Sequence, residues 1–150
     1  MPVCCNAPIR WRHLVSLAGA ALALSPLASA AEGASAGKAA EHVVLQISEG
    51  DAFKQKLLLN NVANLLEHGE PDQVEVVAYG PGLRLFARDN PRTQRIQALM
   101  DRGVTFTACA TTMRVMDKDL ADLVAGARKV PSGVAHLVKR QSQGWGYLRP

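Results

Sequence analysis

The chain has 150 residues, 17 of them basic and 13 acidic, which gives a net charge of +4, and 48% of its residues are hydrophobic. A chain of this size forms one domain with a single core and needs no disulfide staples. Because no basic stripe is interleaved with aromatic residues, the charge does not indicate nucleic-acid binding.

The N-terminus carries the pattern of a signal peptide over residues 1–30. Arg10 and Arg12 precede an apolar run at 14–24, which is too short to span a bilayer comfortably. Ala28-Ser29-Ala30 then fits a small-x-small cleavage site. We expect cleavage near Ala30 and export to the periplasm, or secretion, with no stable membrane anchor. An uncleaved anchor is the alternative.

Cleavage changes both the charge and the cysteine count. Loss of two of the 17 basic residues leaves 15 against 13 acidic ones, a net charge of +2. Cys4 and Cys5 are lost as well, so Cys109 is the only cysteine left of three, and no internal disulfide is available. Residues 31–40 are rich in Ala, Gly and Ser and predict a flexible leader before a domain at 41–150.

The first half of the domain alternates strand and helix patterns. A nearly continuous apolar run at 42–47 predicts a buried strand. A helix follows, with Asp51 as N-cap and Gly69 at its end. Its apolar face comprises Phe53, Leu57, Leu58, Val62, Leu65 and Leu66. Residues 74–79 predict the second strand, and 83–87 fit either a short strand or a helical turn.

The second half repeats the alternation. Asn90-Pro91 reads as the N-cap and first residue of a helix that ends at Gly103, and the strand 104–109 follows. Apolar residues at 120, 123 and 124 have helical spacing. A short strand at 127–130, a helix capped by Ser132 and a strand at 145–149 complete the pattern. We therefore predict a three-layer α/β/α sandwich with a five-stranded, mainly parallel sheet.

Cys109 closes the third strand, just before a helix start. Ligands of an open parallel sheet gather at the carboxyl ends of its strands, and a helix start favours a thiolate. Residues that follow the first three strands share this edge, and we expect six of them as neighbours: Glu49, Gly80, Gly82, Thr111, Thr112 and Arg114. From position alone, a buried structural cysteine is an equally good interpretation.

Two of the neighbours also have alternative interpretations. Gly80-Pro81-Gly82 fits an anion cradle or, more simply, a turn that needs glycine dihedrals. Arg114 either lowers the thiol pKa or binds an oxyanion, or it faces solvent and does neither. Of the histidines, only His136 is placed near this edge by the predicted topology. We expect it to cap the helix or to face solvent rather than to act on the thiol. No metal-ligand spacing, P-loop or nucleophile elbow occurs, so the sequence predicts neither metal nor cofactor.

Four segments together make the chain resemble the DsrE/DsrF-like family of small sulfur-metabolism proteins, over roughly 42–150. They are VEVVAYGPGL (74–83), GVTFTAC (103–109), VPSGV (130–134) and QSQGWGYLRP (141–150). The resemblance implies a trimer or hexamer, and a cysteine after the third strand that carries sulfur as a persulfide. Cys109 occupies that position.

The resemblance thus implies a periplasmic sulfur carrier or sulfurtransferase-like protein that exchanges sulfur with a donor or acceptor protein. An oligomeric binding module with a structural cysteine is the alternative. A thiol redox partner is a third interpretation, although no second cysteine is present to resolve a mixed disulfide.

Overall fold

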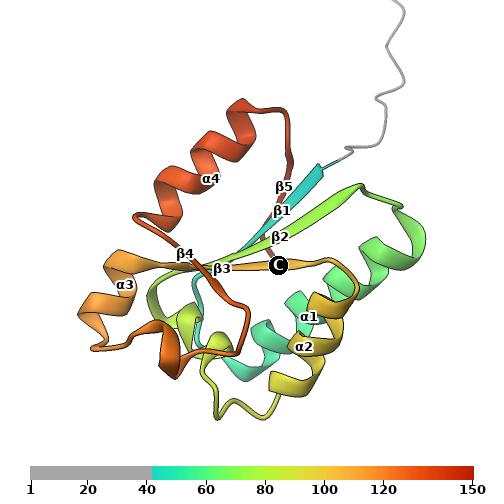
Figure 1. Ribbon diagram of the computed structural model, residues 1–150. Helices are drawn as coiled ribbons and strands as arrows, with labels where there is room; N and C mark the ends of the chain where they lie inside the picture. Colours follow the sequence, from blue (N-terminus) through green and yellow to red (C-terminus); the bar gives the residue numbers. More distant parts are fainter. Residues whose placement is uncertain (1–41) are drawn as a thin grey trace, which may run out of the picture. The chain divides into compact units, whose positions relative to one another are not determined.

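The computed structural model describes residues 42–150, and the expected signal peptide, its cleavage site and the leader lie outside this range. The chain order of the elements (Figure 1) is β1 (His42–Ile47), α1 (Ala52–His68), β2 (Gln73–Ala78), η1 (Gly80–Phe86), α2 (Thr93–Asp101), β3 (Thr105–Cys109), α3 (Ala110–Val115), η2 (Leu120–Asp122), β4 (Arg128–Val130), α4 (Gly133–Ser142) and β5 (Gly146–Leu148).

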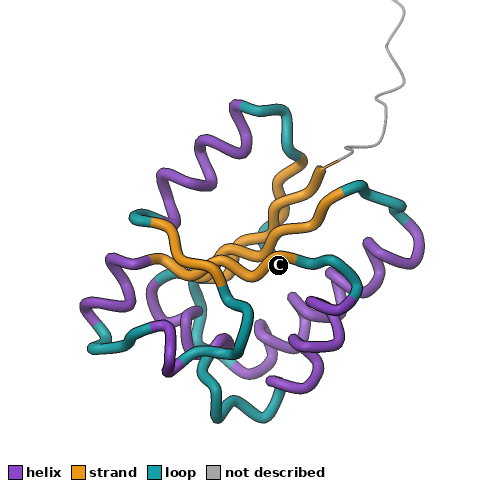
Figure 2. Tube along the Cα trace, in the orientation of Figure 1, coloured by secondary structure: helices purple, strands orange, loops and turns teal. Residues whose placement is uncertain are grey.

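All strand pairs of the sheet are parallel, and the strand order is β4-β3-β2-β1-β5. Helices α1 and α2 cover one face, and α4 alone covers the other (Figures 1 and 2). This arrangement confirms the predicted α/β sandwich, and the sheet is entirely rather than mainly parallel.

The two faces of the sheet differ in chemistry. The larger apolar core contains Leu45, Leu58, Val76, Phe86 and Phe106 and includes residues of α1 and α2. A much smaller cluster forms under α4. Its buried members are Val44, Val77 and Leu137, with Tyr79 and Trp145 packed against them. The stability of the domain therefore rests mainly on the α1 and α2 side.

Strand register decides what faces α4. Neighbouring β2 and β3 pair Glu75 with Thr105 and Val77 with Thr107. Side chains alternate between faces along a strand, so Glu75, Thr107 and Cys109 all lie on the same side as Val77, which packs under α4. A polar layer thus separates the sheet from its single covering helix.

Several local predictions need correction. The second helix begins at Thr93 rather than Pro91, because Asn90 instead caps a turn, its Oδ1 accepting from the Arg92 N–H at 2.9 Å. Of the two alternatives for residues 83–87, the helical turn is confirmed, because most of this segment belongs to the 3₁₀ helix η1.

The helical spacing at 120–124 gives only the short η2. Asp119 caps this turn, and the chain then extends: Leu123 bridges to Ala87, and the Val124 N–H donates to the carbonyl of Phe86. The apolar spacing there reflects burial of an extended segment rather than a helix.

The apolar face of α1 is narrower than predicted, and α4 also leaves apolar side chains exposed. Phe53 at the start of α1 is 66% exposed, and Val134 and Val138 on α4 are 53% and 62% exposed. Leu137 is the buried apolar side chain of α4.

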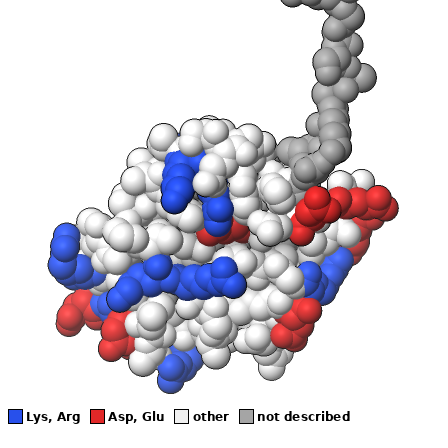
Figure 3. Space-filling model, turned by 45° about the horizontal axis from the view of Figure 1, so that its top comes forward, with Lys and Arg blue, Asp and Glu red and all other residues white. Residues whose placement is uncertain are grey.

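Basic residues of α4 and β4 lie on the surface of the α4 side, where Figure 3 shows Lys and Arg side chains.

Within residues 42–150, no helix is long and apolar enough to cross a membrane.

Candidate functional site

Cys109 is the last residue of β3 and the N-cap residue of α3. The sequence permits this abrupt change because the alternating strand pattern stops at the cysteine and Ala110 begins the helix. Cys109 is a free thiol and 5% exposed, on the face covered by α4. The predicted position at a strand end and helix start is therefore confirmed as geometry.

Donor groups at two helix starts act on the thiol of Cys109. The backbone N–H groups of Gly133, Thr112 and Thr111, and the Thr112 hydroxyl, lower the pKa of this thiol. Burial raises the pKa of the thiol, but these donors outweigh burial, and the net pKa lies below its ordinary value. The donors come from the first turns of α3 and α4, where N–H groups have no partner within the helix. The site therefore favours a thiolate.

Gly133 makes the approach of α4 to the cysteine feasible. A Cβ at this position would lie 3.1 Å from Cys109 Cβ and 3.3 Å from Tyr79 Cβ. Ser132 caps α4, its side chain accepting from the Ala135 N–H at 3.3 Å. A helix N-cap followed by glycine thus brings the start of α4 against Cys109.

Thr111 and Thr112 have different side-chain roles. The Thr112 hydroxyl accepts from the Gly80 N–H at 2.9 Å and lowers the pKa of the Cys109 thiol. The Thr111 hydroxyl instead donates to the carbonyl of Pro131 at 3.1 Å, which joins α3 to the loop before α4. The structure brings Thr111, Thr112 and Gly80 together with Cys109.

The Gly80-Pro81-Gly82 segment forms a turn whose N–H groups are already engaged. Gly80 has a φ of 53°, and the Gly82 N–H donates to the carbonyl of Ser48 at 3.0 Å. A Cβ on Gly82 would lie only 2.4 Å from the oxygen of Ile47. Both glycines thus serve packing and the turn, and only Gly80 reaches the site, through Thr112.

The other two expected neighbours lie elsewhere. Glu49 forms an ion pair with Arg149, and this hydrogen bond lowers the pKa of Glu49 to about 2. Glu49 follows β1, which is separated from β3 by β2, about 10 Å across the sheet. Arg114 is exposed in the last turn of α3. The structure does not join these side chains to the thiol.

A cleft of about 320 Å³ lies beside α3, and it shares Arg84 and Met116 with a neighbouring hollow of about 580 Å³. The residues that line the smaller cleft are Gly80, Pro81, Arg84, Thr111, Thr112, Val115 and Met116. It adjoins the thiol through the two threonines. Among residues 42–150, no group of three His, Cys, Asp or Glu side chains could hold a metal ion.

A buried carboxylate beneath α4 was not predicted from the sequence. Glu75 is 2% exposed, and it binds His136, Arg140 and Thr107. His136 therefore faces Glu75 rather than the thiol. The signal was present in the sequence: an acidic residue interrupts an apolar strand, and His136 and Arg140 are one helical turn apart.

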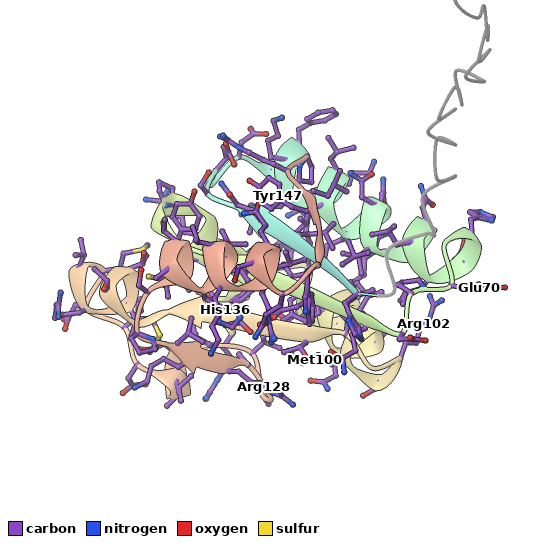
Figure 4. The ribbon with its side chains drawn as sticks, turned by 90° about the horizontal axis from the view of Figure 1, so that it is seen from above. Glu70, Met100, Arg102, Arg128, His136 and Tyr147 are labelled. Carbon is purple, nitrogen blue, oxygen red and sulfur yellow. The ribbon has the colours of Figure 1, made fainter. Side chains whose placement is uncertain are left out.

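A second polar network lies beside the first. The Gln46 side chain donates to the Tyr79 hydroxyl at 2.6 Å and accepts from the Tyr147 hydroxyl. Burial raises the pKa of Tyr147. Figure 4, which views the domain from the α4 side, shows His136 on one side of the helix and Tyr147 on the other.

The chain is similar to a known protein family and to solved structures. Residues 34–150 match the model of the DsrE/DsrF-like family. The chain is similar to MTH1491 from Methanobacterium thermoautotrophicum, a protein of unknown function, with 41% identity, a TM-score of 0.71, and coverage of 73% of this chain and 98% of that one. No curated protein matches significantly.

Two more distant structures share the fold. BT1422 from Bacteroides thetaiotaomicron, a conserved protein of unknown function, is 16% identical with a TM-score of 0.58, over 73% of this chain and 95% of that one. The ychN protein from E. coli is 13% identical with a TM-score of 0.60, over 73% and 98%. At these identities the likeness concerns the fold alone.

Proposed function

The chain belongs to the DsrE/DsrF-like family, and from this premise we propose that it is a periplasmic sulfur carrier or sulfurtransferase-like protein with Cys109 as the persulfide acceptor. The observation that carries the proposal is the position of Cys109 at the start of α3 and against Gly133 of α4, where N–H groups of both helices lower the thiol pKa and favour the thiolate. A thiolate is the form of cysteine that attacks sulfur.

The proposed reaction has two steps. The Cys109 thiolate attacks a sulfane sulfur of a polysulfide, a new S–S bond forms, and the donor leaves as a polysulfide shortened by one sulfur. The thiolate of an acceptor then attacks the outer sulfur of the persulfide, and Cys109 is released as a thiolate. The same N–H donors stabilise the thiolate before the first step and after the second.

The test is transfer of one sulfur atom to the purified protein. After incubation with polysulfide or thiosulfate, the peptide that contains Cys109 should gain about 32 Da, one persulfide sulfur, by mass spectrometry. Cys109→Ser is the control, and its equivalent peptide should gain nothing. If the wild-type peptide gains no mass while free cysteine in the same solution does, the proposed function is wrong.

Export is part of the proposal and has its own support, the basic and apolar segments before Ala30. Expression of the full chain in a Gram-negative host, followed by fractionation and N-terminal sequencing, should recover a periplasmic protein that begins near Ala31. Recovery of the intact chain in the cytoplasm would refute the proposed location.

We also propose that the protein is a homo-oligomer, a trimer or hexamer. The apolar side chains Val134 and Val138, exposed on α4, support association of copies. Sedimentation analysis should give three or six times the monomer mass, and a monomer at micromolar concentration would contradict the proposal.

The alternative function, a binding module with a structural cysteine, is favoured by the 5% exposure of Cys109. Alkylation of the native protein separates the two functions. A reactive thiolate reacts in the folded protein, whereas a structural thiol reacts rapidly only after denaturation.

A further inference from the structure

Glu75 is a buried carboxylate that the proposed sulfur chemistry does not use. Both of its oxygens are occupied: Oε1 accepts from the Thr107 hydroxyl at 2.6 Å and lies 2.9 Å from His136 Nε2, and Oε2 accepts from Arg140 Nε at 2.6 Å. Burial raises the pKa of Glu75, but these three partners outweigh burial and hold it below its ordinary value. The carboxylate is therefore ionised and only accepts hydrogen bonds.

The partners of Glu75 connect three elements. Glu75 lies on β2, Thr107 lies on β3 two residues before Cys109, and His136 and Arg140 lie on successive turns of α4. His136 follows Gly133 by three residues, so one of these contacts is at the end of α4 that packs against Cys109.

Few other contacts hold α4 on the sheet. Leu137 is its buried apolar side chain, and Val134 and Val138 point outward. Arg140 also lies over the ring of Trp145 at 4.2 Å. A buried ion pair of this kind is costly to break from one side, because the remaining charges lose their partners. The position of α4 thus depends strongly on one carboxylate.

We propose that Glu75 is a positioning residue for the thiol: it fixes α4 over β2 and β3 and so holds the first residue of α4, Gly133, against Cys109. The inference rests on the proposed function of Cys109 as a sulfur-accepting thiolate, and it assigns the control of that thiolate to a side chain that does not touch it.

Two variants test the role. Glu75→Gln removes the charge and keeps the shape, whereas Glu75→Asp keeps the charge but shortens the side chain, so that it no longer reaches both partners on α4. The matched control is Glu49→Gln, because Glu49 is also paired with an arginine but follows a strand that does not adjoin β3. The thiol pKa is measured from the pH dependence of alkylation at the Cys109 peptide, and circular dichroism checks the fold.

The sign of the change is diagnostic. Loss of a nearby negative charge by itself lowers a thiol pKa, whereas loss of N–H donors raises it. We expect both Glu75 variants to raise the thiol pKa and to slow alkylation by about tenfold at a pH below it, which corresponds to one pKa unit. Glu49→Gln should leave the thiol pKa unchanged.

An unchanged or lowered thiol pKa in a folded Glu75 variant overturns the positioning role. If Glu75→Gln fails to fold, Glu75→Asp decides the question alone. The persulfide assay of the wild-type protein is independent of this result. Sulfur uptake with no pKa shift in the variants refutes only the positioning role, and a pKa shift without sulfur uptake refutes only the proposed function.

Discussion

The hydroxyl of Thr112 offers the most direct test of how the site favours a thiolate. Thr112→Val replaces this hydroxyl by a methyl group of similar size, which removes a group that lowers the thiol pKa and the acceptor of the Gly80 N–H. A hydrogen bond to a charged group contributes about 1.5–3 kcal/mol. One pKa unit corresponds to about 1.4 kcal/mol. Because the N–H groups of Gly133, Thr111 and Thr112 remain, we expect the thiol pKa to rise by about one unit.

The assay is the pH dependence of alkylation of native Cys109, followed at its peptide. Thr111→Val is the matched control, since the Thr111 hydroxyl binds the carbonyl of Pro131 rather than the sulfur. Thr112→Ser restores the hydroxyl and should restore the pKa. Thr112→Val should also lower the free energy of unfolding by about 1–3 kcal/mol, because the Gly80 N–H loses its acceptor. Equal thiol pKa values in the two valine variants would refute the assignment.

Three further predictions concern close approach, packing and pH. Gly133→Ala should raise the thiol pKa, because its Cβ would lie 3.1 Å from Cys109 Cβ and displace the start of α4; an unchanged alkylation profile would contradict this. Gly82→Ala should lower the free energy of unfolding by about 3 kcal/mol in urea titrations, since its Cβ would lie 2.4 Å from the Ile47 oxygen. Arg149→Met should remove stability that the Glu49 pair provides above pH 4.5 and that is lost as the pH falls toward 2. Wild type and Arg149→Met should therefore converge in urea titrations at acid pH, and a constant difference would exclude the pair as its cause.

The order and type of the main elements could be predicted because the spacing of their apolar residues indicates which side chains are buried. The strand at 42–47 is apolar throughout, and Asp51 and Ser132 are caps with a side-chain oxygen. The segment at 120–124 misled the prediction because an extended chain that buries Leu123 and Val124 has the same apolar spacing as a helix. The order of the strands in the sheet could not be predicted, because it depends on pairing between strands that are far apart in the sequence.

The site was predictable at the cysteine and less so around it. The chain order of strands and loops gives the shared edge but not which strands are adjacent, so Glu49 was expected near the thiol although β2 separates its strand from β3. Gly133 was not predicted as a neighbour of the thiol, because the sequence does not show that β4 pairs with β3. This pairing brings the loop after β4 to the end of β3. Glu75 was missed because a charge in a strand ordinarily marks an exposed position.

The uneven layers of the sandwich have a consequence for motion. Helix α4 covers its face of the sheet with one buried leucine and a set of polar contacts, whereas α1 and α2 pack on a large apolar core. Elements with few buried apolar contacts open at a free energy well below that of global unfolding. Amide hydrogens of α4 should therefore exchange with solvent earlier than those of α1. A bulky partner would then gain access to Cys109 through opening of this one helix, while the rest of the domain stays folded.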